Sequence, residues 1–330
     1  MLTALENSQD ATSLDLPTMA EIEASTEVIG TRGTTAKVVK VRTYAVKYGT
    51  GVSLGEAQNL SYIAGKCSAL LVPKVYGTLS EKRTLRNFII MEYIDGQSLD
   101  KVLPSLSAAE KSEICHQLHE AVTQMRDIPA PDYIGSINHG DCPDGLLCTP
   151  PPIDPLTSGP FSDENAMNEG MLRRLAETES EAYINFLRSL IDQTLKGHRI
   201  CFAHEDLQAK NIVVRRKSKQ QSEELRADMR TGKDVNSSGE NLEEVMRFES
   251  PAYTSLVQNG TDEEIGSKME WEVIFLDWEN SGWYPEYWDF CIAAYTARFL
   301  PEYLEVVTQA LDVYPQEYLM MKMLRDMIFA

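Results

Sequence analysis

The sequence predicts an α+β protein of two lobes: a small antiparallel β lobe with one helix, then a larger, mainly α-helical lobe. Apolar and polar residues alternate over residues 26–48, as in strands that bury one face. Apolar residues recur at helical spacing over residues 54–64 and again in the second half of the chain. The length of 330 residues is sufficient for two such lobes.

The first lobe is predicted over residues 21–97, after a disordered leader at residues 1–20. Three strands fill residues 26–48, and the short turn between the last two indicates a meander. After the helix, two further apolar runs of strand type follow at residues 73–79 and 87–94. The order is therefore three strands, one helix and two strands.

The second lobe is predicted over residues 98–330. A stretch rich in Pro, Gly and Asp at residues 129–163 is expected to form a long loop. Apolar residues at helical spacing predict helices in three places: residues 107–127, 164–196 and 288–328.

Residues 216–270 interrupt this pattern. Ser, Glu, Asp, Lys and Asn dominate there, and such a composition buries too little surface to offset the entropy of ordering. We expect a mostly disordered insertion with a possible short helix at residues 241–248. A solvated surface loop is favoured over a regulatory segment.

Composition and charge exclude several classes of protein. The formal net charge of -19 offers no general footprint for nucleic acid or for anionic membranes. Six cysteines without C-x-x-C spacing or a histidine cluster argue against a zinc site or a disulfide scaffold. There is no signal peptide and no long apolar run, so a cytoplasmic protein is expected. Without a coiled-coil heptad or a large apolar stripe, we expect a monomer.

The segment HEDLQAKN carries the central chemical signal. It fits the H-x-D-L-x-x-x-N catalytic loop of kinases, with His204, Asp206 and Asn211 at the fixed positions. Asp206 would accept the hydrogen of an attacking hydroxyl, and Asn211 would offer an uncharged oxygen to a Mg²⁺ that bridges phosphates. His204 is expected to brace the loop. A similar triplet at residues 139–141 is interpreted as loop, because Leu146 stands where Asn is needed.

A second carboxylate follows much later in the chain. An apolar strand in EVIFLDWENSG ends at Asp277, where a kinase needs its second metal-binding carboxylate. The strand after Asn211 and the strand before Asp277 would pair and bring these two residues to the same metal ions. The insertion would then lie at the tip of that hairpin, where added length costs little.

The first lobe supplies nucleotide-binding candidates. Lys47 in Tyr-Ala-Val-Lys matches the strand whose lysine contacts the α- and β-phosphates, and Glu56 on the next helix would hold it by an ion pair. Gly30 and Gly33 lie one strand upstream, where backbone amides can approach phosphate oxygens.

The segment Met-Glu-Tyr-Ile that includes Glu92 and Ile94 is typical of a hinge that receives adenine through backbone groups. Taken singly, these features have plainer interpretations, such as a surface ion pair or turn carboxylates. Their order along the chain favours a protein-kinase-like fold: Gly loop, Lys, Glu, hinge, catalytic loop, Asp.

The chain resembles the phosphotransferase enzyme family that includes aminoglycoside phosphotransferases and choline kinases, most of all its uncharacterised fungal members. The resemblance spans residues 26–300 apart from the insertion. It implies an ATP- and Mg²⁺-dependent kinase with Asp206 as catalytic base, Asn211 and Asp277 as Mg²⁺ ligands and Lys47 as a phosphate contact. The segments that carry it are AVKYGTGVSLGEAQNLSYI, VPKVYG, FIIMEYIDGQSL, YIGSI, GPFSDENAMNEGML, HEDLQAKNIVV and DWENSGWYPEYWDF.

Two features depart from the family pattern. Glu205 stands where the family usually has Gly, and an acid beside the catalytic Asp can shift its pKa or disturb the loop. The long insertion is also atypical. Both leave open the alternative of a catalytically silent pseudokinase that serves as a binding or scaffold module.

The acceptor is expected to be a small molecule with a hydroxyl group. No A-P-E segment, which protein kinases use in seating a peptide, follows Asp277. Glu279, Glu286 and Asp289 would suit a cationic acceptor such as an amine or aminoglycoside. The alternative is that Asp289 caps a helix and that Glu286 is a solvated carboxylate. Four aromatic residues are expected to pack in the core rather than to form a ligand cage: Trp283, Tyr284, Tyr287 and Trp288.

Overall fold

The structure is a computed structural model that describes residues 15–67, 70–148, 153–218 and 269–329. Contacts divide the chain into two compact units, residues 1–215 with 271–330, and residues 216–270. The interior of the predicted insertion, its short helix and the first 14 residues of the predicted leader lie outside the described residues. The boundary between lobes at residues 97 and 98 stays a prediction.

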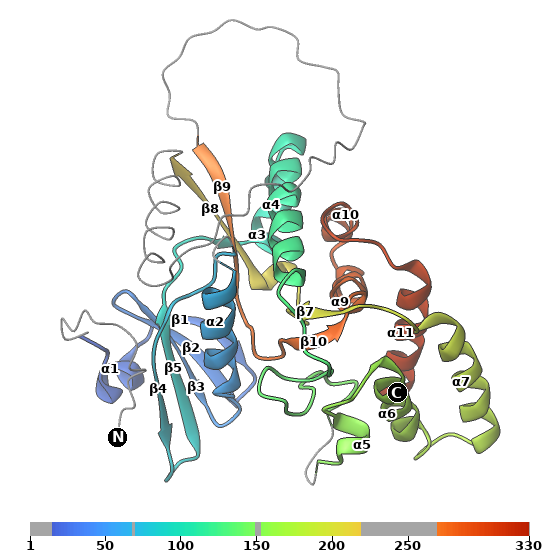
Figure 1. Ribbon diagram of the computed structural model, residues 1–330. Coiled ribbons are helices and arrows are strands. Elements are labelled where there is room, and N and C mark those ends of the chain that lie inside the picture. The colour runs from blue at the N-terminus through green and yellow to red at the C-terminus, as the bar shows by residue number, and fades with distance from the viewer. Residues whose placement is uncertain (1–14, 68–69, 149–152, 219–268, 330) are drawn as a thin grey trace, which may run out of the picture. The chain divides into compact units, whose positions relative to one another are not determined.

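A five-stranded antiparallel sheet forms the first part of the chain. Its spatial order is β1-β2-β3-β5-β4, and helix α2 joins β3 to β4. The predicted order of three strands, one helix and two strands is thus confirmed (Figure 1). The elements are β1 (Val28–Arg32), β2 (Ala36–Val41), β3 (Tyr44–Gly49), α2 (Gly55–Lys66), β4 (Val75–Glu81) and β5 (Arg86–Glu92).

Alternation along β3 gives the sheet two different faces. Val46 is fully buried in a small cluster with Phe88 and Ile22, whereas its neighbour Ala45 belongs to the main core. Lys47 faces the same way as Ala45, because successive side chains in a strand point to opposite faces. The strand therefore delivers a lysine to the face that α2 covers.

A short helix, α1 (Met19–Ala24), covers the other face of the sheet. Thr18 and Glu21 form a capping box at its start, and Ile22 is 1% exposed against the sheet. The disordered leader predicted up to residue 20 is therefore wrong in its last residues. The reason is local: the capping pattern T-x-x-E precedes an apolar residue that the sheet can bury.

The rest of the described chain is mainly helical, as predicted. The pattern at residues 164–196 resolves into two helices, because Ser180 caps a new helix after the first one ends. The loop at residues 129–163 holds one short helix. The helices are α3 (Leu99–Val102), η1 (Leu103–Ser105), α4 (Ala108–Arg126), α5 (Pro155–Ser158), α6 (Glu164–Leu175), α7 (Glu181–Thr194), η2 (Ala209–Asn211), α9 (Trp288–Ala297), α10 (Pro301–Ala310) and α11 (Pro315–Ile328).

Two small sheets position the loops that contain Asp206 and Asp277. One has the order β6-β8-β9, so the strands after Asn211 and before Asp277 are neighbours, as expected. The other pairs β7 with β10, a strand that the sequence did not predict. The strands are β6 (Gln97–Ser98), β7 (Ile200–Ala203), β8 (Ile212–Ser218), β9 (Met269–Phe275) and β10 (Gly282–Pro285).

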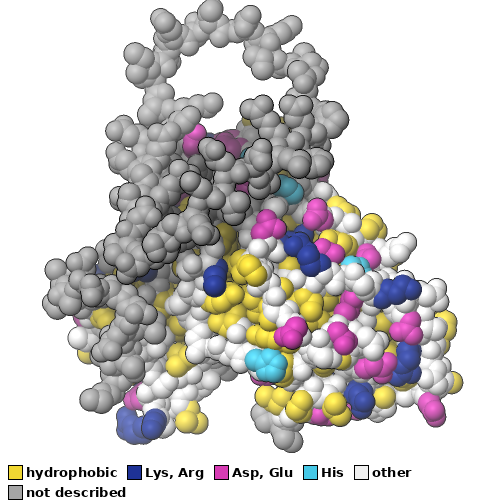
Figure 2. Space-filling view, viewed as in Figure 1, with side chains coloured by type: hydrophobic (Ala, Val, Ile, Leu, Met, Phe, Trp, Pro, Cys, Tyr) yellow, Lys and Arg dark blue, Asp and Glu magenta, His cyan; other side chains and the backbone are white. Residues whose placement is uncertain are grey.

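The four aromatic residues around β10 pack in the core, which confirms that expectation. Trp283 is 3% exposed, and the other three are fully buried: Tyr284, Tyr287 and Trp288. On the face shown in Figure 2, acidic and basic side chains are interspersed around an apolar area, so this face carries no continuous acidic surface. Among the described residues, no helix combines the length and the apolar composition needed to cross a membrane.

Candidate active site

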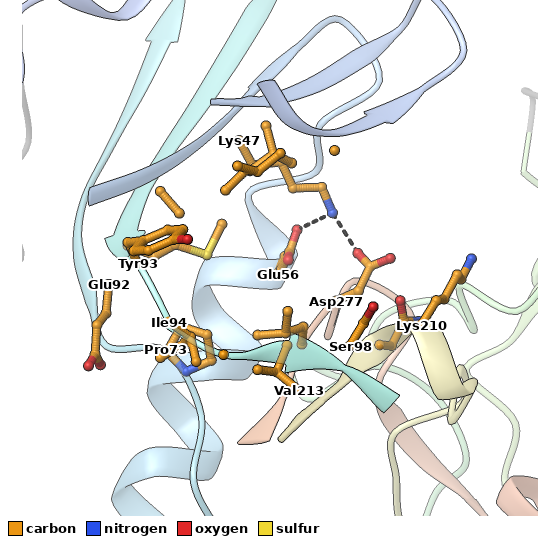
Figure 3. A pocket seen from close by; sticks show the side chains of 18 of the residues that line it. Lys47, Glu56, Pro73, Glu92, Tyr93, Ile94, Ser98, Lys210, Val213 and Asp277 are labelled. Carbon is orange, nitrogen blue, oxygen red and sulfur yellow. Dashed lines mark hydrogen bonds and ion pairs between the residues drawn. The ribbon is translucent and has the colours of Figure 1, made fainter. Parts of the chain in front are cut away.

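A cavity of about 720 Å³ opens beside the face of the sheet that carries Lys47. Its size lies within the usual range of ligand pockets, roughly 300–1,000 Å³. Strands β1 to β3, helix α2 and the segment after β5 line one side, and α3, η2, β8 and the end of β9 line the other. Figure 3 shows the hinge side chains at one end of this cavity, with Asp277 and Lys210 toward the other.

Lys47 lies at the centre of a charged group that we call the lysine cluster: Lys47, Glu56, Asp277 and Glu279. Its Nζ lies 2.7 Å from Glu56 Oε2 and 2.6 Å from Asp277 Oδ1 (Figure 3). Glu279 Oε2 is a third partner at 3.2 Å. The predicted ion pair of Lys47 and Glu56 is present, and one cation is shared by three carboxylates.

Burial and charge act against each other in the lysine cluster. Burial alone would lower the pKa of Lys47, but the nearby carboxylates outweigh it and raise that pKa above its ordinary value. Burial raises the pKa of Glu56, and the ammonium of Lys47 opposes that rise. Burial would raise the pKa of Asp277, but nearby cations, Lys47 first among them, together outweigh burial, so its pKa is lowered. Lys47 is therefore charged in the ordinary pH range, and Asp277 is ionised.

The donors around Asp277 fit a hard divalent cation. Oxygen atoms of Glu56, Asp277 and Glu279 lie within 4.8 Å of one another. Asn211 lines the same cavity, and its Nδ2 donates to Asp206 Oδ2 at 2.8 Å, which leaves its amide oxygen for a ligand. Carboxylate and amide oxygens are the ligands that Mg²⁺ takes.

Backbone hydrogen bonds hold the two predicted metal ligands together. The N–H of Leu276, next to Asp277, donates to the carbonyl of Asn211 at 2.8 Å. Asp277 itself adopts a left-handed conformation, with φ of 65°. A non-glycine residue in that region is strained, and such strain is often found at functional sites. The predicted convergence of residues 211 and 277 is present in the structure.

His204 braces the loop rather than facing the cavity. It is fully buried, and its Nε2 lies 3.0 Å from the carbonyl of Leu276, to which it donates. Its Nδ1 accepts from the N–H of Asp206 at 3.2 Å. Burial lowers the pKa of His204, so the neutral ring with one donor and one acceptor nitrogen fits both contacts.

Asp289 also supports the catalytic loop, a role that the sequence did not reveal. Its buried carboxylate accepts from the N–H of Glu205 at 2.8 Å and from the N–H of His204 at 3.3 Å. Ser281 donates to the carbonyl of His204 at 3.1 Å. These contacts fix the backbone just before Asp206, which is partly exposed.

Glu205 adopts an unusual backbone conformation within the predicted catalytic loop. Its φ is 74°, a region that glycine adopts at no steric cost, which explains why Gly is usual at this position. Its side chain is buried beside the fully buried Asp144, and we call these two residues the carboxylate pair. Burial, and then the charge of Asp144, raise the pKa of Glu205 well above its ordinary value. The raised pKa favours the acid form of Glu205, the form that carries a hydrogen for the neighbouring Asp144.

The carboxylate of Asp144 accepts two further hydrogen bonds. It accepts from the N–H of Leu146 and from Trp288 Nε1, the latter at 3.2 Å. It lies three residues after the triplet at residues 139–141. The loop that sequence reasoning set aside therefore contributes a buried residue that lies beside Glu205 of the predicted catalytic loop. The acids at positions 141 and 144 were visible in the sequence, but nothing in their spacing marked a partner for Glu205.

Of the remaining predicted nucleotide-binding residues, three line the cavity and one does not. Gly30, Glu92 and Ile94 line the cavity. Gly33 lies in the turn after β1, with φ of 54°, and is not among the residues lining the cavity. The carboxylate of Glu92 points away from the lysine cluster in Figure 3, so any adenine contact there would come from the backbone.

The three acids expected to attract a cationic acceptor do not form one group. Glu279 belongs to the lysine cluster, Asp289 is buried under the catalytic loop, and Glu286 pairs with Arg199 at 3.5 Å. The sequence placed them near one another because they are close along the chain. Strand β10 and the start of α9 separate their side chains.

Helix α2 contributes a further supporting residue that sequence reasoning missed. Asn59 lies one turn after Glu56 and donates to the carbonyls of Trp278 and Ser281, at 2.7 and 3.3 Å. It therefore fixes the turn that carries Glu279. An Asn three residues after the ion-pairing Glu on a buried helix face was the available signal.

The fold is that of a protein-kinase-like phosphotransferase: a β lobe whose lysine pairs with a helix glutamate, and a helical part that carries the predicted catalytic loop. Residues 35–222 match the model of the phosphotransferase enzyme family. The chain belongs to this family.

Solved structures of aminoglycoside phosphotransferases resemble the chain at low identity, and a comparison with curated proteins finds no significant match. The streptomycin–ATP ternary complex of APH(2″)-IIa has a TM-score of 0.43, with 12% identity over 84% of this chain and 76% of that one. The GDP complex of aminoglycoside 2′-phosphotransferase-IIIa has 0.47, with 10% identity over 91% and 83%. APH(3″)-Id from Streptomyces rimosus has 0.45, with 12% identity over 92% of each chain.

Proposed function

We propose that this chain is an ATP- and Mg²⁺-dependent phosphotransferase that moves the γ-phosphoryl group of ATP to a hydroxyl of a small molecule. One observation carries the proposal. Lys47, Asn211 and Asp277 line one cavity, and Asp206 is hydrogen-bonded to Asn211 at its edge. These residues come from distant stretches of the chain, and a phosphoryl-transfer site needs each of them.

Each side chain has a distinct task in this reaction. Lys47 binds the α- and β-phosphates, and Glu56 keeps it in place. Asn211 and Asp277 would hold Mg²⁺, which neutralises phosphate charge when it is bound. Asp206 orients the acceptor hydroxyl and takes its proton.

The transfer itself is an in-line displacement. The acceptor oxygen forms a new bond to the γ-phosphorus, and the bond from that phosphorus to the bridging oxygen breaks. The electron pair of that bond leaves with ADP, and the hydroxyl proton passes to the carboxylate of Asp206. Positioning and charge neutralisation supply most of the rate acceleration in such reactions.

The shape of the chain after Asp277 supports a small acceptor. It passes through a turn into β10 at Gly282 and then into α9 at Trp288, and all of these residues are described. Between Asp277 and α9 there is no long segment of the kind that protein kinases use to seat a peptide.

The replacement Asp206→Asn tests the proposal. A screen of hydroxylated small molecules for ADP formation should identify an acceptor for the wild type, and the variant should turn that acceptor over roughly 10²–10⁴-fold more slowly. Its binding of Mg²⁺·ATP should persist. Equal activity in the variant would contradict the assignment. Wild-type protein that is not stabilised by Mg²⁺·ATP would favour the silent pseudokinase instead.

A further inference from the structure

Lys210 is a second lysine of the cavity, at the end away from the hinge (Figure 3), and the proposed mechanism does not use it. It sits on η2 between two buried residues, Ala209 and Asn211, while its own side chain is exposed. Lys210 lines the same cavity as Lys47 and Asp277. Its position is fixed by the loop that also fixes Asp206 and Asn211.

The short helix η2 is held rigidly. The N–H of Asn211 donates to the carbonyl of Gln208 at 2.9 Å, and Tyr303 donates to the carbonyl of Leu207 at 2.8 Å. The side chain of Asn211 donates to Asp206. The base of the Lys210 side chain is therefore anchored, and its flexible end reaches the cavity.

Lys47 and Lys210 differ in the number of carboxylates that pair with them. Lys47 is paired with three carboxylates. Lys210 makes no hydrogen bond or ion pair with any residue in the described ranges, and it acts on Asp277 only through its charge, which favours the ionised form. A flexible, unpaired ammonium in a concave site is suited to an anion.

The position of Lys210 along the cavity indicates which part of a bound nucleotide it would contact. The hinge residues Tyr93 and Ile94 lie at one end, and Lys210 lies beyond Asp277 from them (Figure 3). A nucleotide whose base rests on the hinge must direct its terminal phosphate toward Asp277 and η2. Asp206, which would orient the attacking hydroxyl, precedes Lys210 by only four residues.

We propose that Lys210 binds the γ-phosphoryl group of ATP and stabilises its charge during transfer, an inference that rests on the proposed function. Its ammonium donates hydrogen bonds to non-bridging oxygens of the γ-phosphate and gives up no proton. Charge on those oxygens is the quantity that a phosphotransferase must neutralise. Lys47 cannot supply all of this neutralisation, because three carboxylates already share it.

The test compares nucleotides with and without the γ-phosphate. Binding of ADP and of the non-hydrolysable β,γ-imido analogue of ATP is measured with Mg²⁺ by calorimetry for wild type, Lys210→Ala and Lys210→Arg. Lys210→Ala should lose about tenfold in affinity for the analogue and little for ADP. Lys210→Arg keeps the charge and should recover part of the loss.

Lys101→Ala is the matched control. Lys101 is another exposed lysine that lines the cavity, but it is on α3 and not on the loop that carries Asp206 and Asn211. Its removal should leave the ratio of analogue to ADP affinity unchanged. Because Lys210 is exposed, thermal unfolding without nucleotide should be the same in wild type and variants.

The outcomes separate this inference from the proposed function. If wild type binds the analogue and Lys210→Ala keeps the wild-type affinity ratio, the role of Lys210 is refuted and the proposed function stands. If the wild type binds neither nucleotide, the proposed function fails and the inference with it. A loss in Lys101→Ala equal to that in Lys210→Ala would also overturn it, since general charge would then explain both.

Discussion

The lysine cluster and the carboxylate pair both contain buried or partly buried carboxyl groups, but the two groups differ in how the negative charge is compensated. In the lysine cluster, three acids share one ammonium, and two of them, Glu56 and Asp277, line a cavity. In the carboxylate pair, Glu205 and Asp144 are buried together, and burial and then the charge of Asp144 raise the pKa of Glu205. The first arrangement is open to a charged ligand, and the second is a closed support. Acidic side chains near an active site therefore need not share a role.

The largest expected effect comes from removing the cation of the lysine cluster. Lys47→Ala leaves Glu56, Asp277 and Glu279 facing one another without compensation. We expect a loss of about 3 kcal/mol in the free energy of unfolding at neutral pH. The loss should shrink as the pH falls, because protonation relieves the repulsion. Chemical unfolding at several pH values measures both effects.

The control for this change is Lys82→Ala, at an exposed turn between β4 and β5. It should leave stability unchanged. A Lys47→Ala protein that is as stable as the control at neutral pH would show that the three carboxylates are not close in solution, and the comparison with the carboxylate pair would fail.

The second effect concerns the proton held by Glu205. Its folded pKa is raised above the value of 4.5, so above that pH the folded state binds more protons than the unfolded chain. The stabilising contribution of Glu205 is complete below pH 4.5 and is lost as the pH rises through the folded pKa. One such proton gives a slope of about -1.4 kcal/mol per pH unit within that window.

Glu205→Gln removes this slope while keeping a donor to Asp144. The variant should match the wild type near pH 4.5 and become more stable than it as the pH rises. Glu305→Gln, on the exposed side of α10, is the matched control and should follow the wild type. Parallel stability curves for wild type and Glu205→Gln would mean that Glu205 is ionised in the folded protein.

The smallest effect isolates backbone strain at Glu205. Both Glu205→Gly and Glu205→Ala remove the carboxyl group, but only glycine adopts the observed φ of 74° without strain. We expect the glycine variant to be more stable by about 1 kcal/mol. The difference is measured by unfolding at one pH. If the alanine variant is equally stable, the left-handed conformation is not imposed by the surrounding structure.

Much of the fold and of the lysine cluster was predictable from sequence. The hydrophobic periodicities gave the order of elements around Lys47 and Glu56, and the catalytic-loop spacing identified Asp206 and Asn211. These features depend on residues close together in the chain or on motifs whose spacing has a chemical reason. Asp277 was found because an apolar strand delivers it.

The supporting contacts were not predictable, because they join distant positions without a periodic pattern. Asp144 meets Glu205 although the two residues are 61 positions apart in the chain. Asp289 accepts from the loop backbone, which leaves no trace in side-chain chemistry. Helix α1 was missed because its short capped segment follows a polar leader. Packing on a sheet, rather than local propensity, gives it a partner.

Metal-dependent nucleotide binding tests the central claim most directly. The thermal unfolding of wild type and Asp277→Asn is measured with the β,γ-imido analogue of ATP, with and without Mg²⁺. We expect the wild type to be stabilised by about 2.7 kcal/mol at 100 times the dissociation constant, with Mg²⁺ required, and the variant to lose that Mg²⁺ dependence. The claim would be contradicted if the analogue did not stabilise the wild type. It would also be contradicted if the stabilisation were the same in both proteins, with and without Mg²⁺.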